Sequence, residues 1–115
     1  MTNLYDLAYG MEKAIRESND FAVLMSAYEA VNADPTTKQL FSNFREIQMK
    51  FQSMQMMGQE IPAEEMEAAQ LTLTMAQQNQ QIIKLMEAEQ RFSLVINDVT
   101  KIIMRPLEDI YGGLQ

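Results

Sequence analysis

Apolar side chains recur at intervals of three and four residues along most of the chain, which is the spacing of one face of an α-helix. The first such stripe predicts a helix over residues 3–17. Ser18 and Asn19 are good N-cap residues, and a second stripe begins after them at Phe21. This second stripe predicts either a separate helix or a continuation of the first helix after a bend.

The clearest stripe lies in residues 35–57. Asp34 can cap a helix there, and Pro35 suits its first position, where an N–H group would have no helical partner. The apolar residues alternate in steps of four and three, and they are Leu40, Phe44, Ile47, Phe51 and Met54. A helix of this length spans about 35 Å. Because that exceeds the breadth of a compact domain of this size, the seam needs a partner.

The following segments keep the helical spacing. A turn is predicted over residues 58–61, with the next helix starting at Pro62. The amide tract at residues 77–81 is either a joint between two helices or a polar turn on one long helix. A sharper alternative is a buried amide layer that fixes the register of a dimer.

A second apolar seam occupies the C-terminal third of the chain. Its members are Phe92, Ile96, Val99 and Ile103. Pro106 removes a helical hydrogen bond, so the helix should kink or end near Arg105. Gly112 and Gly113 should then stop a short terminal turn.

No segment shows the alternating pattern of a strand, so the sequence predicts an all-α fold. We expect one domain over residues 1–115, built as an antiparallel bundle of four to five helices, and the long seams favour an intertwined homodimer. The residues expected in the core or the dimer contact are Leu40, Phe44, Ile47, Phe51, Met54, Phe92, Ile96, Val99 and Ile103.

Residues 49–66 contain five methionines around the predicted turn. Packing or subunit contact is the favoured interpretation of these side chains. A recognition surface that uses the adaptable methionine side chain is an alternative. A thioether copper site is a third, but such sites usually include histidine or cysteine as well.

Composition narrows the classes of function. The net charge of −7 should repel nucleic acids and anionic membranes. The absence of cysteine and histidine excludes disulfides, thiolate or imidazole metal sites and thiol nucleophiles. The first thirty residues lack the pattern of a signal peptide, and no apolar run approaches the ~20 residues that cross a bilayer. We therefore expect a cytoplasmic protein.

Candidate chemistry is sparse. The densest acidic cluster is Glu60, Glu64, Glu65 and Glu67, but the Glu-x-x-His spacing of bundle metal sites is absent, so a solvated helix start is the favoured interpretation. The glycines form no phosphate-binding loop. The nine basic residues are scattered rather than arranged as a phosphate-tracking stripe. The sequence predicts no enzyme activity, no metal or other cofactor, and no direct contact with nucleic acid.

Two segments carry a family resemblance: "FSNFREIQMKFQSMQMMGQEIPAEE" and "LMEAEQRFSLVINDVTKIIMRPLEDIYG". Together with the opening "NLYDLAYGMEKAI", they resemble the YlbF/YmcA family of small bacterial proteins, in particular its cysteine-free YheA-like branch from Gram-positive bacteria. The resemblance implies an all-helical, intertwined dimer. It also links some members to competence, biofilm formation and sporulation, through a complex that modulates an RNA-cleaving enzyme. The iron–sulfur clusters of those members are held by cysteines, which this sequence lacks.

The leading hypothesis is a non-catalytic helical adaptor or regulatory protein that acts through protein–protein contacts with an unknown partner. One alternative is an accessory factor of an RNA-processing complex, as the resemblance implies for related proteins. A second alternative is a carboxylate-based metalloenzyme.

Overall fold

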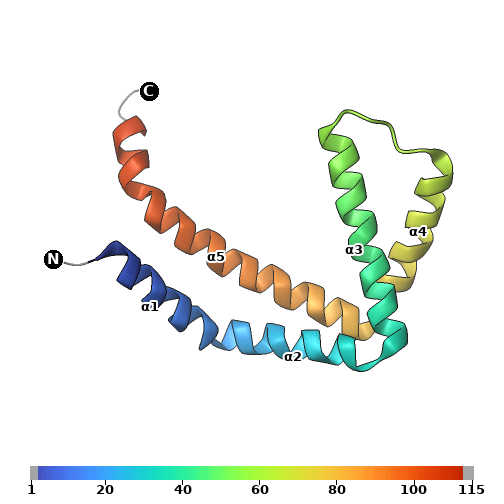
Figure 1. The fold of residues 1–115 in the computed structure, drawn as a ribbon, viewed down its shortest axis with the longest axis horizontal. Helices are drawn as coiled ribbons and strands as arrows, with labels where there is room; N and C mark the ends of the chain where they lie inside the picture. Colours follow the sequence, from blue (N-terminus) through green and yellow to red (C-terminus); the bar gives the residue numbers. More distant parts are fainter. Residues whose placement is uncertain (1–2, 113–115) are drawn as a thin grey trace. The chain divides into compact units, whose positions relative to one another are not determined.

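The computed structural model describes residues 3–112, and over these residues the chain forms five α-helices and no strand (Figure 1). The helices are α1 (Leu4–Arg16), α2 (Asn19–Ala33), α3 (Pro35–Met56), α4 (Ala63–Gln77) and α5 (Gln80–Gly112). The prediction of an all-α fold is confirmed. Within residues 3–112, none of the helices combines the length and the apolar character that crossing a lipid bilayer requires.

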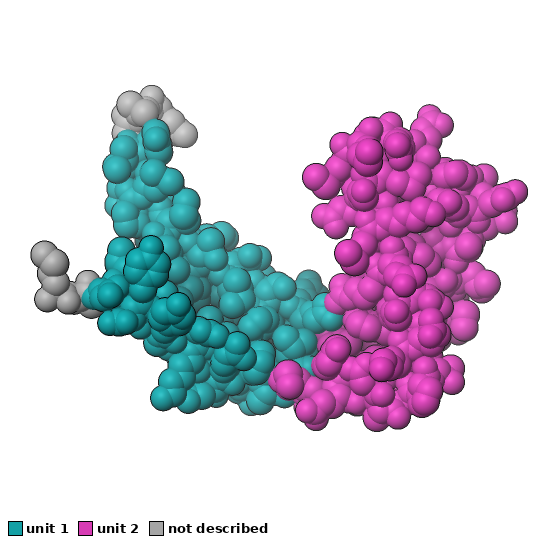
Figure 2. Space-filling model, in the orientation of Figure 1, with its two compact units in different colours: residues 1–24, 87–115 teal, residues 25–86 magenta. Residues whose placement is uncertain are grey.

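The chain divides into two compact units (Figure 2). Unit 1 consists of residues 1–24 and 87–115, and unit 2 consists of residues 25–86. Helices α2 and α5 each contribute one part to unit 1 and the other part to unit 2. That the whole chain folds as a single domain stays a prediction.

Local side-chain signals set most helix ends. Ser18 separates α1 from α2, because its hydroxyl donates to the Ile15 carbonyl at 2.6 Å and accepts from the Phe21 N–H at 3.3 Å. The second stripe is therefore a separate helix. At the start of α3, Asp34 Oδ1 accepts from the Thr36 N–H at 3.2 Å, with Pro35 in the first turn.

Gly58 ends the α3 region as expected. Its φ of 71° is the left-handed conformation that favours glycine, and the Gln59 N–H donates to the Met54 carbonyl at 2.9 Å. The amide tract is a joint between two helices, since α4 ends at Gln77 and α5 starts at Gln80.

A kink or an end of the C-terminal helix was expected near Arg105, and the expected end is wrong. Helix α5 continues through Pro106 to Gly112, so the proline does not terminate it. The proline deprives only one carbonyl, that of Ile102, of its helical donor. Every residue from 101 to 112 is exposed, so water can hydrate that carbonyl and the loss is tolerable. Gly113, the second expected stop residue, lies outside the described residues.

Unit 2 contains most of the buried side chains. Helices α3 and α4 form an antiparallel hairpin in it, joined by residues 57–62 (Figure 1). The buried apolar residues of this unit are Val31, Phe44, Ala69, Ala76, Ile82 and Leu85. Apolar burial here is the main source of stability that the chain provides by itself.

Unit 1 has a thinner core. None of the residues of α1 is buried, and Ala88 is the buried apolar residue of this unit's described part. The rings of Phe21 and Phe92 pack with their centroids 5.8 Å apart and their planes tilted by 51°. Much of the apolar surface of unit 1 therefore remains open to a partner.

Candidate protein-interaction surfaces

The α3–α4 hairpin contains an open groove of about 590 Å³. Phe44 is buried in it, and Phe51 and Leu73 are half-buried. The other lining residues are Ile47, Gln48, Gln52, Gln55, Met66, Ala69 and Gln70. The floor is thus apolar, while the exposed parts of the lining are mostly uncharged glutamine side chains.

An ion pair connects α3 and α4 across the hairpin. Lys50 Nζ lies 2.9 Å from Glu65 Oε1, and the side chains are 56% and 38% exposed. Pairs at this exposure contribute little to stability, at most about 1 kcal/mol. The second carboxylate oxygen, Glu65 Oε2, is buried and has no hydrogen-bond partner among the described residues. The main effect of the pair is therefore to neutralise one acidic side chain near the turn, and its contribution to the stability of the fold is small.

The hairpin end carries negative charge. Glu60, Glu64 and Glu67 are exposed there, and the sequence has no Lys or Arg from residue 51 to residue 83. Glu64 lies in the first turn of α4, where the helix dipole favours an acidic side chain. Within residues 3–112, no three Asp, Glu, His or Cys residues come together in a way that could hold a metal ion.

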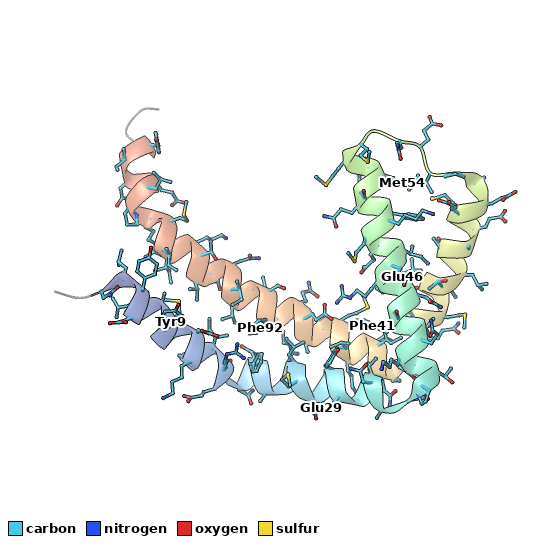
Figure 3. All side chains as sticks on the ribbon, viewed as in Figure 1. Tyr9, Glu29, Phe41, Glu46, Met54 and Phe92 are labelled. Carbon is cyan, nitrogen blue, oxygen red and sulfur yellow. The ribbon has the colours of Figure 1, made fainter. Side chains whose placement is uncertain are left out.

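The methionine-rich segment surrounds the same turn. Met54 is half-buried near the end of α3 (Figure 3), whereas Met49, Met56 and Met57 are 69%, 83% and 68% exposed. The segment is thus a helix end, a turn and a helix start, as the spacing indicated. Its exposed thioethers add apolar surface next to the groove.

A second apolar surface runs along the unit 1 part of α5. Phe92, Ile96 and Val99 are half-buried, and Ile103 is 58% exposed. The stripe extends further, to Leu107 and Ile110, at the same spacing of three and four residues. Sequence reasoning missed these two residues because it expected Pro106 to interrupt the helix, although the spacing itself continues past the proline.

The structure thus places the nine seam residues in two groups. Leu40, Phe44, Ile47, Phe51 and Met54 lie on α3 in unit 2, and the other four lie on α5 in unit 1. Three of the first group line the hairpin groove, and Leu40 lines a shallower hollow on the hairpin with Pro35 and Met75. Their assignment to a core or a dimer contact stays a prediction.

Sequence reasoning also missed a buried polar link in unit 2. Thr37 is only 4% exposed, and its hydroxyl donates to Asp34 Oδ2 at 2.9 Å. Asn79 Nδ2 donates to the same hydroxyl at 3.3 Å, and Asn79 Oδ1 accepts from the Ile82 N–H at 3.0 Å. The link joins the start of α3 to the start of α5.

These features define a small all-α protein whose prominent surfaces are an apolar groove and an apolar helix stripe. A family model described as "Control of competence regulator ComK, YlbF/YmcA" matches residues 4–108. The chain therefore belongs to the YlbF/YmcA family, and the resemblance seen in the sequence is confirmed.

Relatives in Bacillus are similar over nearly the whole chain. A UPF0342 protein of Bacillus pumilus is 51% identical over 111 residues, which covers 96% of this chain and 94% of the relative. The UPF0342 protein YheA of Bacillus subtilis is 48% identical over 113 residues, covering 98% and 97%. The similarity to YheA confirms the YheA-like branch.

Solved structures show the same fold. A protein of unknown function (DUF964) from Bacillus stearothermophilus matches with a TM-score of 0.80 and 42% identity, covering 94% of this chain and 95% of that one. The structure of YheA from Bacillus subtilis matches with a TM-score of 0.73, covering 96% and 100%. Bacillus subtilis RicA, solved in complex with RicF, shares only the fold, with a TM-score of 0.68 and 16% identity over 92% and 94% of the chains.

Proposed function

We propose that this protein is a non-catalytic helical adaptor or regulatory protein that acts through protein–protein contacts. The observation that carries the proposal is the amount of apolar surface left open on regular helices, above all the stripe along the second part of α5. Contiguous exposed apolar surface on a folded protein usually marks an interaction site.

The family context supports this proposal. The matching family model is described by its relation to a competence regulator, and RicA was solved in complex with another protein, RicF. Both descriptions concern regulation or assembly rather than a chemical reaction. A role in protein contacts is the simplest function that this chain can share with them.

We further propose that the protein is a homodimer whose contact includes the α5 stripe. A twofold contact is self-complementary, so one apolar stripe can cover the same stripe of a second copy. Burying such a stripe contributes roughly 25 cal/mol per Å² of apolar surface. The four α5 seam residues, Phe92, Ile96, Val99 and Ile103, belong to this proposed contact.

Size-exclusion chromatography with light scattering tests the homodimer. The chain mass is 13.2 kDa, so a dimer is expected at about 26 kDa at micromolar concentration. A mass equal to that of one chain over the same concentration range would refute the dimer.

Chemical crosslinking in the source bacterium, followed by affinity capture of the tagged protein, tests the adaptor role. We expect one or a few other proteins to be retained in amounts comparable to the bait. Capture of the bait alone, under conditions where a known bacterial complex is recovered intact, would contradict the proposal.

A further inference from the structure

The α3–α4 groove has the layered chemistry of a protein-docking site. Its floor is formed by apolar side chains such as Phe44, Phe51 and Leu73. Its rim is formed by glutamines, which can donate and accept hydrogen bonds without the desolvation cost of a charge. Charged residues are depleted at the centres of protein interfaces and are common outside them. The same order, from apolar floor to neutral rim to charged surroundings, is present here.

At the hairpin end, the surface around the groove carries a net negative charge. Lys50 is paired with Glu65, so the exposed carboxylates of Glu60, Glu64 and Glu67 dominate the electrostatic field there. Glu67 lies three residues before Gln70, one of the rim glutamines, and therefore near the groove edge. A partner that enters this groove meets apolar surface and negative charge together.

We propose that the groove binds an amphipathic helix of a partner protein that carries Lys or Arg beside its apolar face. This inference rests on the proposed function and describes the partner by its chemistry. The groove runs from Phe44 to Gln55 on α3, which is about 16 Å along the helix axis. That length matches about three turns of a bound helix, with apolar anchors at positions i, i+3 or i+4, and i+7.

Charge makes the acidic helices α2 and α4 of a second copy poor occupants. Helix α1 has no net charge, and α2, α4 and α5 each contain more acidic than basic residues. Helix α3 is net positive, but its apolar face already forms one wall of the groove. Docking α4 of another copy, which carries three acidic residues and no basic one, would place like charges together. A basic helix from a different protein has the complementary charge.

A designed peptide provides the direct test. The probe is a fluorescein-labelled peptide of roughly 15 residues, with leucines on one helical face and lysines elsewhere, and its twin has glutamate in place of every lysine. Fluorescence anisotropy should show binding of the lysine peptide and none of the twin. Binding should weaken as NaCl rises from about 0.05 to about 0.5 M, because the carboxylates are exposed and screened by salt. Equal binding of both peptides would overturn the proposal.

Two matched pairs of variants locate the binding. Changing Glu60, Glu64 and Glu67 to Gln should weaken the lysine peptide about tenfold at low salt, since three exposed charge pairs each contribute modestly. The control changes three exposed acids of unit 1, Glu17→Gln, Glu108→Gln and Asp109→Asn, which alters net charge equally. Equal weakening by the control would show general charge attraction and would refute the groove.

The second pair tests the apolar lining of the groove with two residues of α4. Met66 lines the groove and is 50% exposed, whereas Leu71 is 64% exposed and does not line it. Met66→Ala should weaken the peptide several-fold and Leu71→Ala should not. A reversal variant that combines Glu60→Lys, Glu64→Lys and Glu67→Lys should bind the glutamate twin in place of the lysine peptide. That gain of binding cannot arise from misfolding.

Two further results separate the possible failures. If Met66→Ala or the Gln triple variant turns a dimer into a monomer in light scattering, the groove holds a second copy and the inference is wrong. If affinity capture retains the same partner with wild type and with both groove variants, the adaptor function stands and only the docking site is refuted. Loss of that partner with the groove variants alone supports the inference.

Discussion

At the scale of single residues, the polar link between Thr37 and Asn79 shows how a buried hydroxyl is accommodated. A buried polar group without a partner is costly, and Thr37 avoids that cost by bonding both Asp34 and Asn79. Asn79 also caps α5 through its bond from the Ile82 N–H. One amide side chain therefore fixes the start of a helix and satisfies a buried group 42 residues away in sequence.

Replacing Asn79 with alanine should lower the free energy of unfolding by about 1 kcal/mol, because the helix cap is lost. Urea denaturation followed by circular dichroism measures this change. Gln78→Ala, an exposed position in the same turn, is the control and should change stability by less than about 0.5 kcal/mol. Both variants are compared at one protein concentration, since dimerisation would alter the apparent stability. Equal effects of the two substitutions would contradict the capping role of Asn79.

This link could not be predicted from the sequence. Asn79 belongs to a tract of amides in which each residue is an equally plausible surface side chain, and Thr37 follows an ordinary helix start. Their contact depends on the packing of two turns that lie far apart in the chain. Helix caps such as Asp34 were predictable because a cap and its N–H donor are sequence neighbours.

At the scale of elements, features set by neighbouring residues could be predicted from the sequence, whereas features set by contacts between distant segments could not. Apolar spacing and turn residues are local, and they predicted the α3 and α4 helices and the turn at Gly58. The groove depends on which faces of α3 and α4 meet, which the spacing alone does not determine. Pro106 failed as a stop signal because the cost of a missing hydrogen bond depends on exposure, which is a property of the folded chain.

Gly58→Ala tests the turn between α3 and α4. Its φ of 71° is unfavourable for alanine, so the substitution should destabilise unit 2 by roughly 1–2 kcal/mol. An added Cβ meets nothing within 4 Å at Gly58 or at Gly10, so steric clash does not contribute at either position.

Gly10→Ala is the matched control, because Gly10 lies within α1 at a helical φ. This substitution should be neutral or stabilise the helix by up to about 1 kcal/mol. The thermal unfolding midpoint should therefore fall in Gly58→Ala and stay the same or rise in Gly10→Ala. A shift of the same sign and size in both would refute the assigned turn geometry.

At the scale of the whole molecule, the two units differ in how much they can stabilise themselves. Unit 2 has a set of buried apolar residues, whereas α1 in unit 1 has none. Association is the most direct way to cover the exposed apolar side chains of unit 1. We expect the dimer to stabilise unit 1 more than unit 2.

Ile103→Asp should disrupt the proposed dimer. The substitution places a charge in the α5 stripe and should weaken association at least tenfold, which is about 1.4 kcal/mol. Light scattering should show the mass of one chain at concentrations where wild type is dimeric. Because Ile103 is 58% exposed, the substitution should leave the helical circular dichroism signal of the chain close to that of wild type.

Leu94→Asp is a close control for Ile103→Asp. Leu94 has the same exposure of 58% on the same helix, but nine residues of helical rotation place it on the opposite face. This variant should stay dimeric. If both substitutions produce monomers, or neither does, the dimer contact does not lie on the α5 stripe.

The exposed methionines at the hairpin end make this part of the molecule sensitive to oxidation. The chain has no cysteine to react first, and the thioethers of Met49, Met56 and Met57 are accessible to an oxidant such as hydrogen peroxide. Conversion to the sulfoxide makes each side chain polar, and methionine sulfoxide reductases can reverse it. Oxidative damage to this protein would therefore change the apolar character of the hairpin end before it reached the buried residues of unit 2.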